Sequence, residues 1–106
     1  MRQNSEIDWE PFDKILVKLE KDKEKILKLT EWHTDNRFQR PGIRFTVIEE
    51  DNKQVSKEFM TTSRRLITKL KPIIEIAEAK GKEHITVSIT KTGDGFEANF
   101  IVKDLT

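Results

Sequence analysis

The spacing of apolar residues changes along the chain, and each change marks a different predicted element. The first stretch has apolar side chains at the spacing of one helical face, at Phe12, Leu16, Leu19, Ile26 and Leu29. Asp8 is a suitable N-cap for such a helix, and Pro11 is tolerated in a first helical turn. The pattern therefore predicts a helix over residues 8–31.

A two-residue alternation replaces the helical spacing after residue 42. Apolar residues alternate with polar neighbours, as in a strand with one buried face, at Ile43, Phe45 and Val47. Asp51-Asn52 has the composition of a hairpin turn, and residues 54–59 form the predicted return strand. This region is therefore predicted to be the first β-hairpin.

A second helical pattern follows the hairpin, with apolar residues at Leu66, Leu70, Ile73 and Ala77. Each of the three hydroxyl residues 61–63 can cap this helix, and Lys80-Gly81 can end it. Pro72 lies inside the pattern, where it removes one backbone donor and clashes with the preceding turn. Either a kinked helix or two abutting helices would accommodate this proline.

The C-terminal region returns to strand spacing and is predicted to be a second hairpin. Residues 84–91 alternate, with apolar side chains at Ile85, Val87 and Ile89. Residues 92–95 contain two glycines, which is a strong hairpin-turn signal. The last segment alternates in the same way, with Phe96, Ala98, Phe100 and Val102 on one face.

The predicted order is α-β-β-α-β-β, an α+β fold in which two helices pack on one face of a four-stranded antiparallel sheet. The helices would bury their apolar stripes there, and the opposite sheet face would be polar. Residues 1–7 are predicted to be a flexible N-terminal arm. Residues 8–106 are predicted to be a single domain, since the length suits one compact unit.

The composition restricts the class of protein without identifying a function. The net charge is only +1 although 37% of residues are charged, so attraction to phosphate must come from local asymmetry. The absence of cysteine excludes disulfides and thiolate chemistry. No apolar stretch approaches the roughly 20 residues of a membrane span, so we expect a cytoplasmic protein without a membrane partner. The richness in Lys, Glu and Ile resembles that of thermophile proteins.

The residue pattern does not favour catalysis. His33 and His84 are far apart, and neither has metal-ligand spacing to a carboxylate or to another histidine. No serine lies in a nucleophile-elbow context, and no glycine-rich phosphate loop precedes a helix. We therefore expect a protein that is not an enzyme, without a metal or other cofactor.

Arginine is concentrated in one part of the chain. Five of the six arginines lie between residues 37 and 65, at Arg37, Arg40, Arg44, Arg64 and Arg65. Arginine recognises phosphate with a planar fork, and aromatic rings give unpaired bases a stacking platform. Trp32 and Phe38 are the aromatic residues near this cluster that could serve as platforms. These seven residues are the predicted nucleic-acid-binding site.

Each aromatic residue also has a structural interpretation. Trp32 could cap the first helix against the sheet or line a cleft together with Phe38. Phe45 and Phe59 fit a core better than a platform, because both alternate with polar residues in predicted strands. Arg64-Arg65 opens the second helix and opposes its dipole, at a cost that a bound anion or an acid such as Glu58 could offset.

The segment Thr62-Ser63-Arg64-Arg65-Leu66 resembles the Ile-Phe-Arg-Arg-Leu motif of ThermoDBP-type single-stranded DNA-binding proteins from thermophilic archaea. The match covers Arg64, Arg65 and Leu66, while Thr62 and Ser63 replace the Ile and Phe. The resemblance implies a small α+β fold over residues 8–103 that binds single strands with limited sequence preference.

The combined pattern predicts a non-enzymatic domain that binds single-stranded DNA or RNA. Phosphates would contact the five arginines, and bases would stack on the two aromatic rings. The alternative is a protein-protein interaction module, for example a homodimer formed by pairing of exposed sheet edges. Arginine and tryptophan are also common anchors of protein interfaces, so composition alone leaves both hypotheses open.

Overall fold

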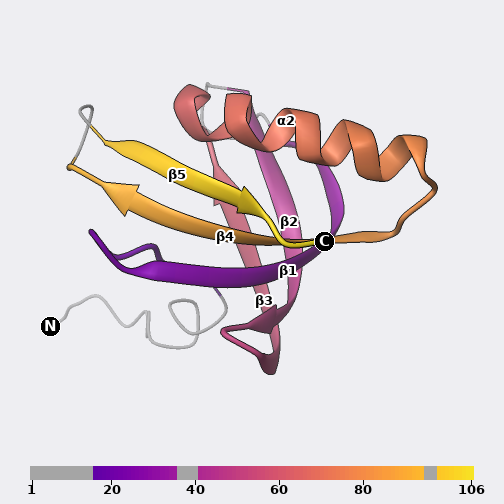
Figure 1. Ribbon diagram of the computed structural model, residues 1–106, viewed down its shortest axis with the longest axis horizontal. Coiled ribbons are helices and arrows are strands. Elements are labelled where there is room, and N and C mark those ends of the chain that lie inside the picture. The colour runs from indigo at the N-terminus through magenta and orange to yellow at the C-terminus, as the bar shows by residue number, and fades with distance from the viewer. Residues whose placement is uncertain (1–15, 36–40, 95–97) are drawn as a thin grey trace, which may run out of the picture.

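The computed structural model describes residues 16–35, 41–94 and 98–106 of the chain. Their elements are β1 Glu24–Asp35, β2 Gly42–Glu50, β3 Lys53–Thr61, α2 Arg64–Ala79, β4 His84–Thr92 and β5 Asn99–Asp104. The strands form one antiparallel sheet in the order β3-β2-β1-β4-β5. The helix α2 packs against β5 and β4, as Figure 1 shows.

The predicted order α-β-β-α-β-β is wrong, because the described residues form five strands and a single helix. The central strand β1 occupies the last third, residues 24–31, of the segment predicted to be helical over residues 8–31. Leu27 and Leu29 are fully buried and alternate with partly exposed Lys28 and Thr30, so the two-residue period prevails. Strand pairing with β2 and β4 on both sides satisfies the β1 backbone, which a helix would satisfy internally. Residues 8–15 lie outside the described part.

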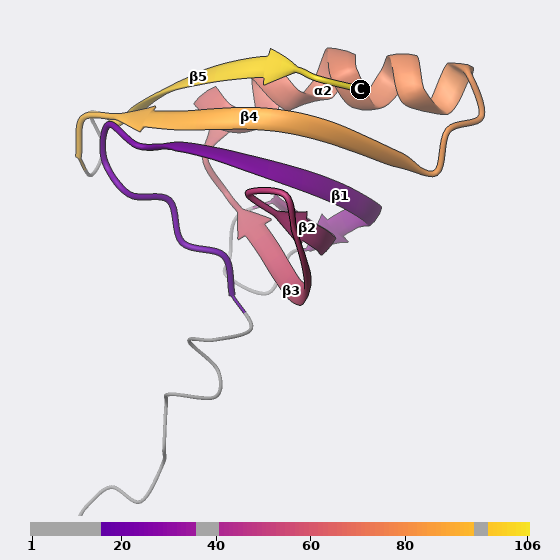
Figure 2. The same ribbon diagram turned by 60° about the horizontal axis from the view of Figure 1, so that its bottom comes forward.

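The sheet is strongly curved, because β1 changes its register with β2 twice. The shifts fall between Lys28 and Leu29 and between Thr30 and His33, and Glu31 within the second shift has a φ of 52°. Such bulges bend a strand and increase its twist. The β2–β3 hairpin therefore turns away from β4 and β5, as Figure 2 shows.

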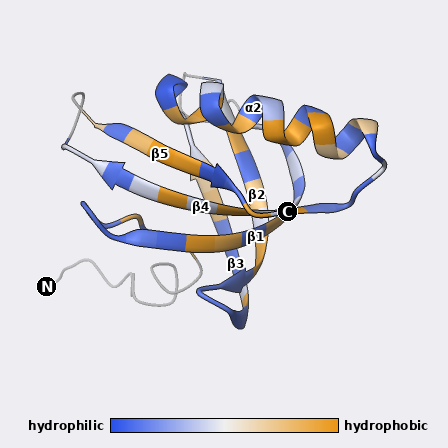
Figure 3. Cartoon of the chain, in the orientation of Figure 1, coloured by the Kyte–Doolittle hydropathy of each residue, from blue (hydrophilic) through white to orange (hydrophobic). Residues whose placement is uncertain are grey.

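The core lies between α2 and the concave face of the sheet. Phe45 and Phe59 are directly opposite each other on β2 and β3, and their ring centroids are 6.1 Å apart. Figure 3 shows apolar stretches on β1, β4 and β5, with apolar positions of α2 alongside them. The side chains of α2 that are buried there are Leu66, Leu70, Ile73, Ile74 and Ala77.

The predictions for the two hairpins and for the second helix are confirmed in the described residues. Asp51 and Asn52 form the β2–β3 turn with positive φ angles, as a tight hairpin requires. The helix α2 begins after its N-cap Ser63 and continues through Pro72 to Ala79 without a break. The alternative of two abutting helices is therefore wrong, and Gly81, with a φ of 69°, follows the helix end.

Other parts of the chain cover sections of both sheet edges. The outer edge of β3 receives a hydrogen bond of 2.9 Å from the Val17 amide to the Glu58 carbonyl. The outer edge of β5 is contacted from α2, because Arg65 and Lys69 donate to the carbonyls of Ala98 and Phe100. The backbone groups most exposed to pairing with another chain are thus partly occupied within the molecule.

Gly42 brings the start of β2 very close to the end of β3. A Cβ atom at this position would lie 2.8 Å from the Thr61 carbonyl oxygen and 3.0 Å from the Thr62 side chain. Only a glycine permits this approach without a backbone shift. The contact fixes the position of residues 61 and 62, which lead into α2.

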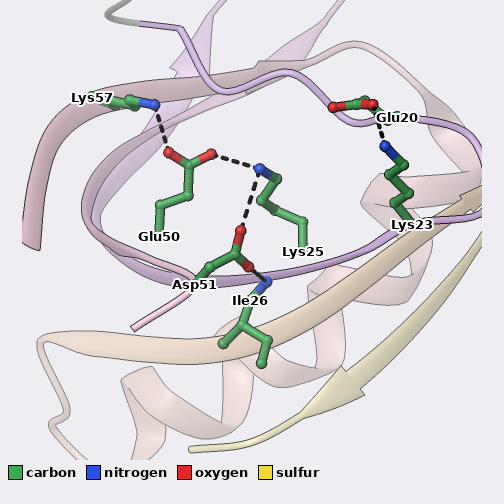
Figure 4. Close-up of polar contacts among 7 residues, drawn as sticks. All are labelled: Glu20, Lys23, Lys25, Ile26, Glu50, Asp51 and Lys57. Carbon is green, nitrogen blue, oxygen red and sulfur yellow. Dashed lines mark hydrogen bonds and ion pairs between the residues drawn. The ribbon is translucent and has the colours of Figure 1, made fainter. Parts of the chain in front are cut away.

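A network of charged side chains lies at the opposite end of the hairpin, beside the β2–β3 turn (Figure 4). The Glu50 carboxylate accepts hydrogen bonds from Lys25, at 2.9 Å, and from Lys57. Asp51 lies 3.4 Å from the Lys25 ammonium and accepts a hydrogen bond of 2.9 Å from the Ile26 amide. The network ties the turn of the hairpin to the start of the central strand.

The two lysines determine the charge state of Glu50. Burial alone would raise the pKa of Glu50, but the hydrogen bonds from Lys57 and Lys25 outweigh this effect and lower the pKa below its ordinary value. The pKa of Lys25 is raised, mainly by its hydrogen bond to Glu50 and against the effect of burial. Lys25 and Lys57 thus both have the Glu50 carboxylate beside them at this end of the hairpin.

Candidate functional site

A cavity of about 790 Å³ opens where the end of β3, the start of α2 and the β4–β5 hairpin meet. Pro41, which directly precedes the tightly packed Gly42 at the start of β2, also lines it. The described residues that line the cavity are Pro41, Met60, Thr61, Thr62, Ser63, Arg64, Arg65, Lys91, Ala98 and Phe100.

The hydroxyl residues before α2 present hydrogen-bond donors at this cavity. The Ser63 amide donates to the Thr61 hydroxyl at 3.0 Å, and the Leu66 amide donates to the Ser63 hydroxyl at 3.3 Å. A hydroxyl that accepts from an amide still has its own proton to donate. Thr61 and Ser63 can thus each offer one donor to a bound acceptor.

The two arginines at the start of α2 differ in their contacts. The Arg65 guanidinium donates from Nη1 to the Ala98 carbonyl at 3.1 Å and to the Asn99 side-chain oxygen at 3.3 Å. These bonds hold it beside the start of β5 and leave its Nε and Nη2 donors available. Arg64 is exposed and has no hydrogen-bond or ion-pair partner among the residues that the structure describes.

The charged side chains in the described lining of the cavity are all cations. Its described lining includes the cations Arg64, Arg65 and Lys91 but no aspartate or glutamate. The first turn of α2 also contains no acid, so the two arginines oppose the positive end of the helix dipole. An unfavourable arrangement of this kind persists more easily when a bound anion can offset it.

The described lining also includes the apolar residues Pro41, Met60, Ala98 and Phe100, which we call the apolar wall. Lys91 lies directly across the β4–β5 ladder from Phe100, which is only 6% exposed. The cavity therefore combines apolar residues with hydrogen-bond donors and with the cations Arg64, Arg65 and Lys91, which we call the cationic wall. A few polar groups among apolar residues are the usual lining of pockets that bind small molecules.

Arg44 lies elsewhere and is engaged within the protein. Its guanidinium is 3.2 Å from the Asp35 carboxylate and 3.0 Å from the Glu58 carboxylate. The Asp35 side chain is only 6% exposed, so this ion pair is largely shielded from water. The Nε atom of Arg44 is buried, without a hydrogen-bond partner in the described structure. Arg44 thus joins β1, β2 and β3 and does not reach the cavity lining.

Trp32 is also distant from the cavity. Its indole Nε1 donates to the Glu78 carboxylate at 3.2 Å, and its ring packs against the core. Glu78 lies near the C-terminal end of α2, about 21 Å along the helix from Arg64 at 1.5 Å per residue. Trp32 therefore packs β1 against α2, and the expectation that it caps a first helix is wrong, because it lies on a strand.

Arg37, Phe38 and Arg40 lie outside the described residues. Arg40 is bonded directly to Pro41, which does line the cavity. The structure thus brings Arg64 and Arg65 together, places Arg44 and Trp32 in other contacts, and leaves the roles of the three loop residues as predictions. Nucleic-acid binding by the set as a whole also stays a prediction.

The chain matches no family model, no curated protein and no solved structure. The resemblance of Arg64-Arg65-Leu66 to the ThermoDBP-type motif therefore rests on those residues alone. The structure adds that the motif lies at the start of a helix that borders a cavity.

Lys91 is the functional candidate that the sequence pattern did not single out. It continues the inward-facing positions of β4 after Ile85, Val87 and Ile89. A lysine at an apolar-face position is unusual, because burial of an unpaired ammonium is costly. That departure from the strand pattern was the available signal.

No group of three or more metal-ligating side chains occurs among the described residues. The described helix is too short and too polar to cross a lipid bilayer.

Proposed function

We propose that this protein is a non-enzymatic domain that binds single-stranded nucleic acid at the cavity beside the start of α2. The observation that carries the proposal is the grouping of Arg64, Arg65 and Lys91 around one cavity whose described lining contains no acid. Guanidinium groups bind phosphate oxygens through charge-assisted hydrogen bonds. The apolar wall offers a surface for a base or a sugar.

The shape and charge of the surface favour a single strand over a duplex. A helix that tracks a groove of a duplex needs basic residues along its length, whereas α2 also carries Glu75 and Glu78 in its second half. A flexible single strand can enter a recess and place its backbone and one base on different walls. The proposed contacts, to phosphate and to one base or sugar, fit DNA and RNA equally.

The contact set differs from the one that the sequence suggested. Arg64 and Arg65 keep their proposed role, and Lys91 joins them. Arg37, Phe38 and Arg40 remain proposed contacts because they directly precede Pro41 in the chain. Arg44 and Trp32 have partners within the protein, so we assign both to the support of the sheet. A cytoplasmic location fits the proposed ligand.

The alternative of a dimer built by strand pairing has less support. Arg65 and Lys69 contact carbonyls along the outer edge of β5, and Val17 contacts the outer edge of β3. A second chain would have to displace these contacts before it could pair with either edge.

Titration of a labelled oligonucleotide at several salt concentrations tests the proposal. Each neutralised phosphate contributes about −0.7 to the slope of log affinity against log salt for a single strand. The three cations therefore predict a slope between about −0.7, if they share one phosphate, and about −2, if each neutralises a separate phosphate. No binding at low salt, or an affinity that does not change with salt, would contradict the proposal. The mass of the protein in solution, with and without oligonucleotide, distinguishes the dimer alternative.

A further inference from the structure

The described lining of the cavity includes the two kinds of surface that one nucleotide would contact, polar or cationic and apolar. The residues 61–65 and Lys91 supply cations and hydroxyls, while Pro41, Met60, Ala98 and Phe100 supply apolar surface. A nucleotide likewise has an anionic phosphate and a base with apolar faces. The volume of about 790 Å³ falls in the range of pockets that enclose a small organic ligand.

Lys91 brings a cation to the cavity from an element other than α2. It is half-buried on the inner side of β4, opposite Phe100, and has no ion-pair partner among the described residues. Its charge adds to those of Arg64 and Arg65 around the same cavity.

The summed positive charge of Arg64, Arg65 and Lys91 exceeds the negative charge of one internal phosphate of a strand. An internal phosphodiester carries one negative charge, whereas a terminal phosphomonoester carries about 1.5 to 2 at neutral pH and has three acceptor oxygens. Where the three cations share one phosphate, a terminal group matches their charge better than an internal one, and the described lining adds no acid.

We infer that the cavity seats the phosphorylated end of a single strand, with the terminal phosphate between Arg64, Arg65 and Lys91 and the adjoining base or sugar against the apolar wall. The inference rests on the proposed function and specifies its ligand. It applies to a phosphate at either end of a strand, because the recognised chemistry is the same.

Four labelled oligonucleotides of one sequence and length test this inference with the full chain. One carries a 5′-phosphate, one a 3′-phosphate and one only hydroxyl ends, and the fourth is a closed circle. We expect one or both phosphorylated strands to bind about tenfold more tightly than the hydroxyl-ended strand, as one added charge-assisted interaction predicts. The comparison of the first two strands shows which end is recognised.

The variant Lys91→Met tests the role of the cationic wall. It should reduce the preference for the phosphorylated end to about twofold or less, while Lys103→Met, at an exposed position of β5, should leave the preference unchanged. The preference in the wild type should also weaken near pH 5, because a phosphomonoester takes up a proton with a pKa of about 6.

Two outcomes separate the inference from the function on which it rests. Equal affinity for all four oligonucleotides would overturn end recognition and leave single-strand binding intact. Failure to bind any of them at low salt would contradict the proposed function itself. A preference for phosphorylated ends that Lys91→Met does not alter would exclude this cavity as the site of end recognition.

Discussion

The two ends of the β2–β3 hairpin contain the same kinds of charged residue but pair them differently. Beside the turn, Lys25 and Lys57 both contact Glu50, so each of these two cations has an acid. At the other end, about 26 Å along β2 at 3.3 Å per residue, the described cavity lining has cations and no acid. Cations of the first kind stabilise the fold, whereas those of the second kind are available to a ligand.

Arg44 shows that the position of an arginine in the sequence does not decide whether it is paired with an acid. It belongs to the same arginine-rich segment as Arg64 and Arg65, yet it lies between Asp35 and Glu58. Substitutions at the cations paired with an acid should therefore change the free energy of unfolding. Substitutions at the cations without an acid should change the affinity for an oligonucleotide.

The largest expected effect on stability is that of Arg44→Met. The substitution removes a charged partner from the nearly buried Asp35 carboxylate and should lower the free energy of unfolding by about 1–3 kcal/mol. Urea denaturation measures this change. The affinity for an oligonucleotide should stay within about twofold of wild type once the variant is folded. A stable variant with weak binding would contradict the division between the two kinds of cation.

Glu50→Gln should have the next largest effect. It leaves Lys25 and Lys57 without their shared carboxylate, and we expect a loss of about 1–2 kcal/mol in the free energy of unfolding. Glu20→Gln is a matched control, because the Glu20–Lys23 pair shown in Figure 4 is exposed on both sides. Exposed pairs contribute little, so the control should change stability by less than about 0.5 kcal/mol. Equal losses in the two variants would show that the Glu50 network stabilises the fold no more than an exposed ion pair does.

The dependence of stability on pH should separate wild type from Glu50→Gln. The pKa of Glu50 is lowered in the folded protein, so its stabilisation is complete above its ordinary pKa of 4.5 and is lost as pH falls through the folded pKa. The difference in unfolding free energy between the two proteins should therefore shrink between pH 6 and about pH 3. A constant difference over this range would argue against a charged Glu50.

Arg64→Glu should have a small effect on stability in the opposite direction. It replaces a cation with an anion at the positive end of the α2 dipole, which should raise the free energy of unfolding by about 0.3–1 kcal/mol. The same substitution should weaken oligonucleotide binding strongly. Thermal unfolding and a binding titration of one preparation provide both measurements, and a loss of stability would contradict an unfavourable charge arrangement at this helix start.

Much of the fold could be predicted from local pattern. The strands around Phe45 and Val87, the Asp51-Asn52 turn and the Ser63 cap all follow from two-residue alternation and cap chemistry. The central strand β1 could not be predicted in this way. Its apolar residues Ile26 and Leu29 fit a helical spacing as well as a strand, and only pairing on both sides decides between them.

The candidate site was predictable only in part. Arg64 and Arg65 are recognisable from their position at a helix start, but the partners of Arg44 come from β1 and β3, which are far apart in the chain. The contribution of Lys91 depends on the β4–β5 register, which places it opposite Phe100. Long-range pairing therefore determines which cations are neutralised, and composition does not reveal it.

The most direct test is a parallel titration of wild type, Arg64→Met and Arg44→Met with the same labelled single strand at low salt. Both substitutions remove one guanidinium and keep a long apolar side chain. We expect Arg64→Met to weaken binding by about fivefold or more and to reduce the salt slope by about 0.7, while Arg44→Met binds as wild type does. Equal weakening by both variants, or none by Arg64→Met, would contradict this expectation.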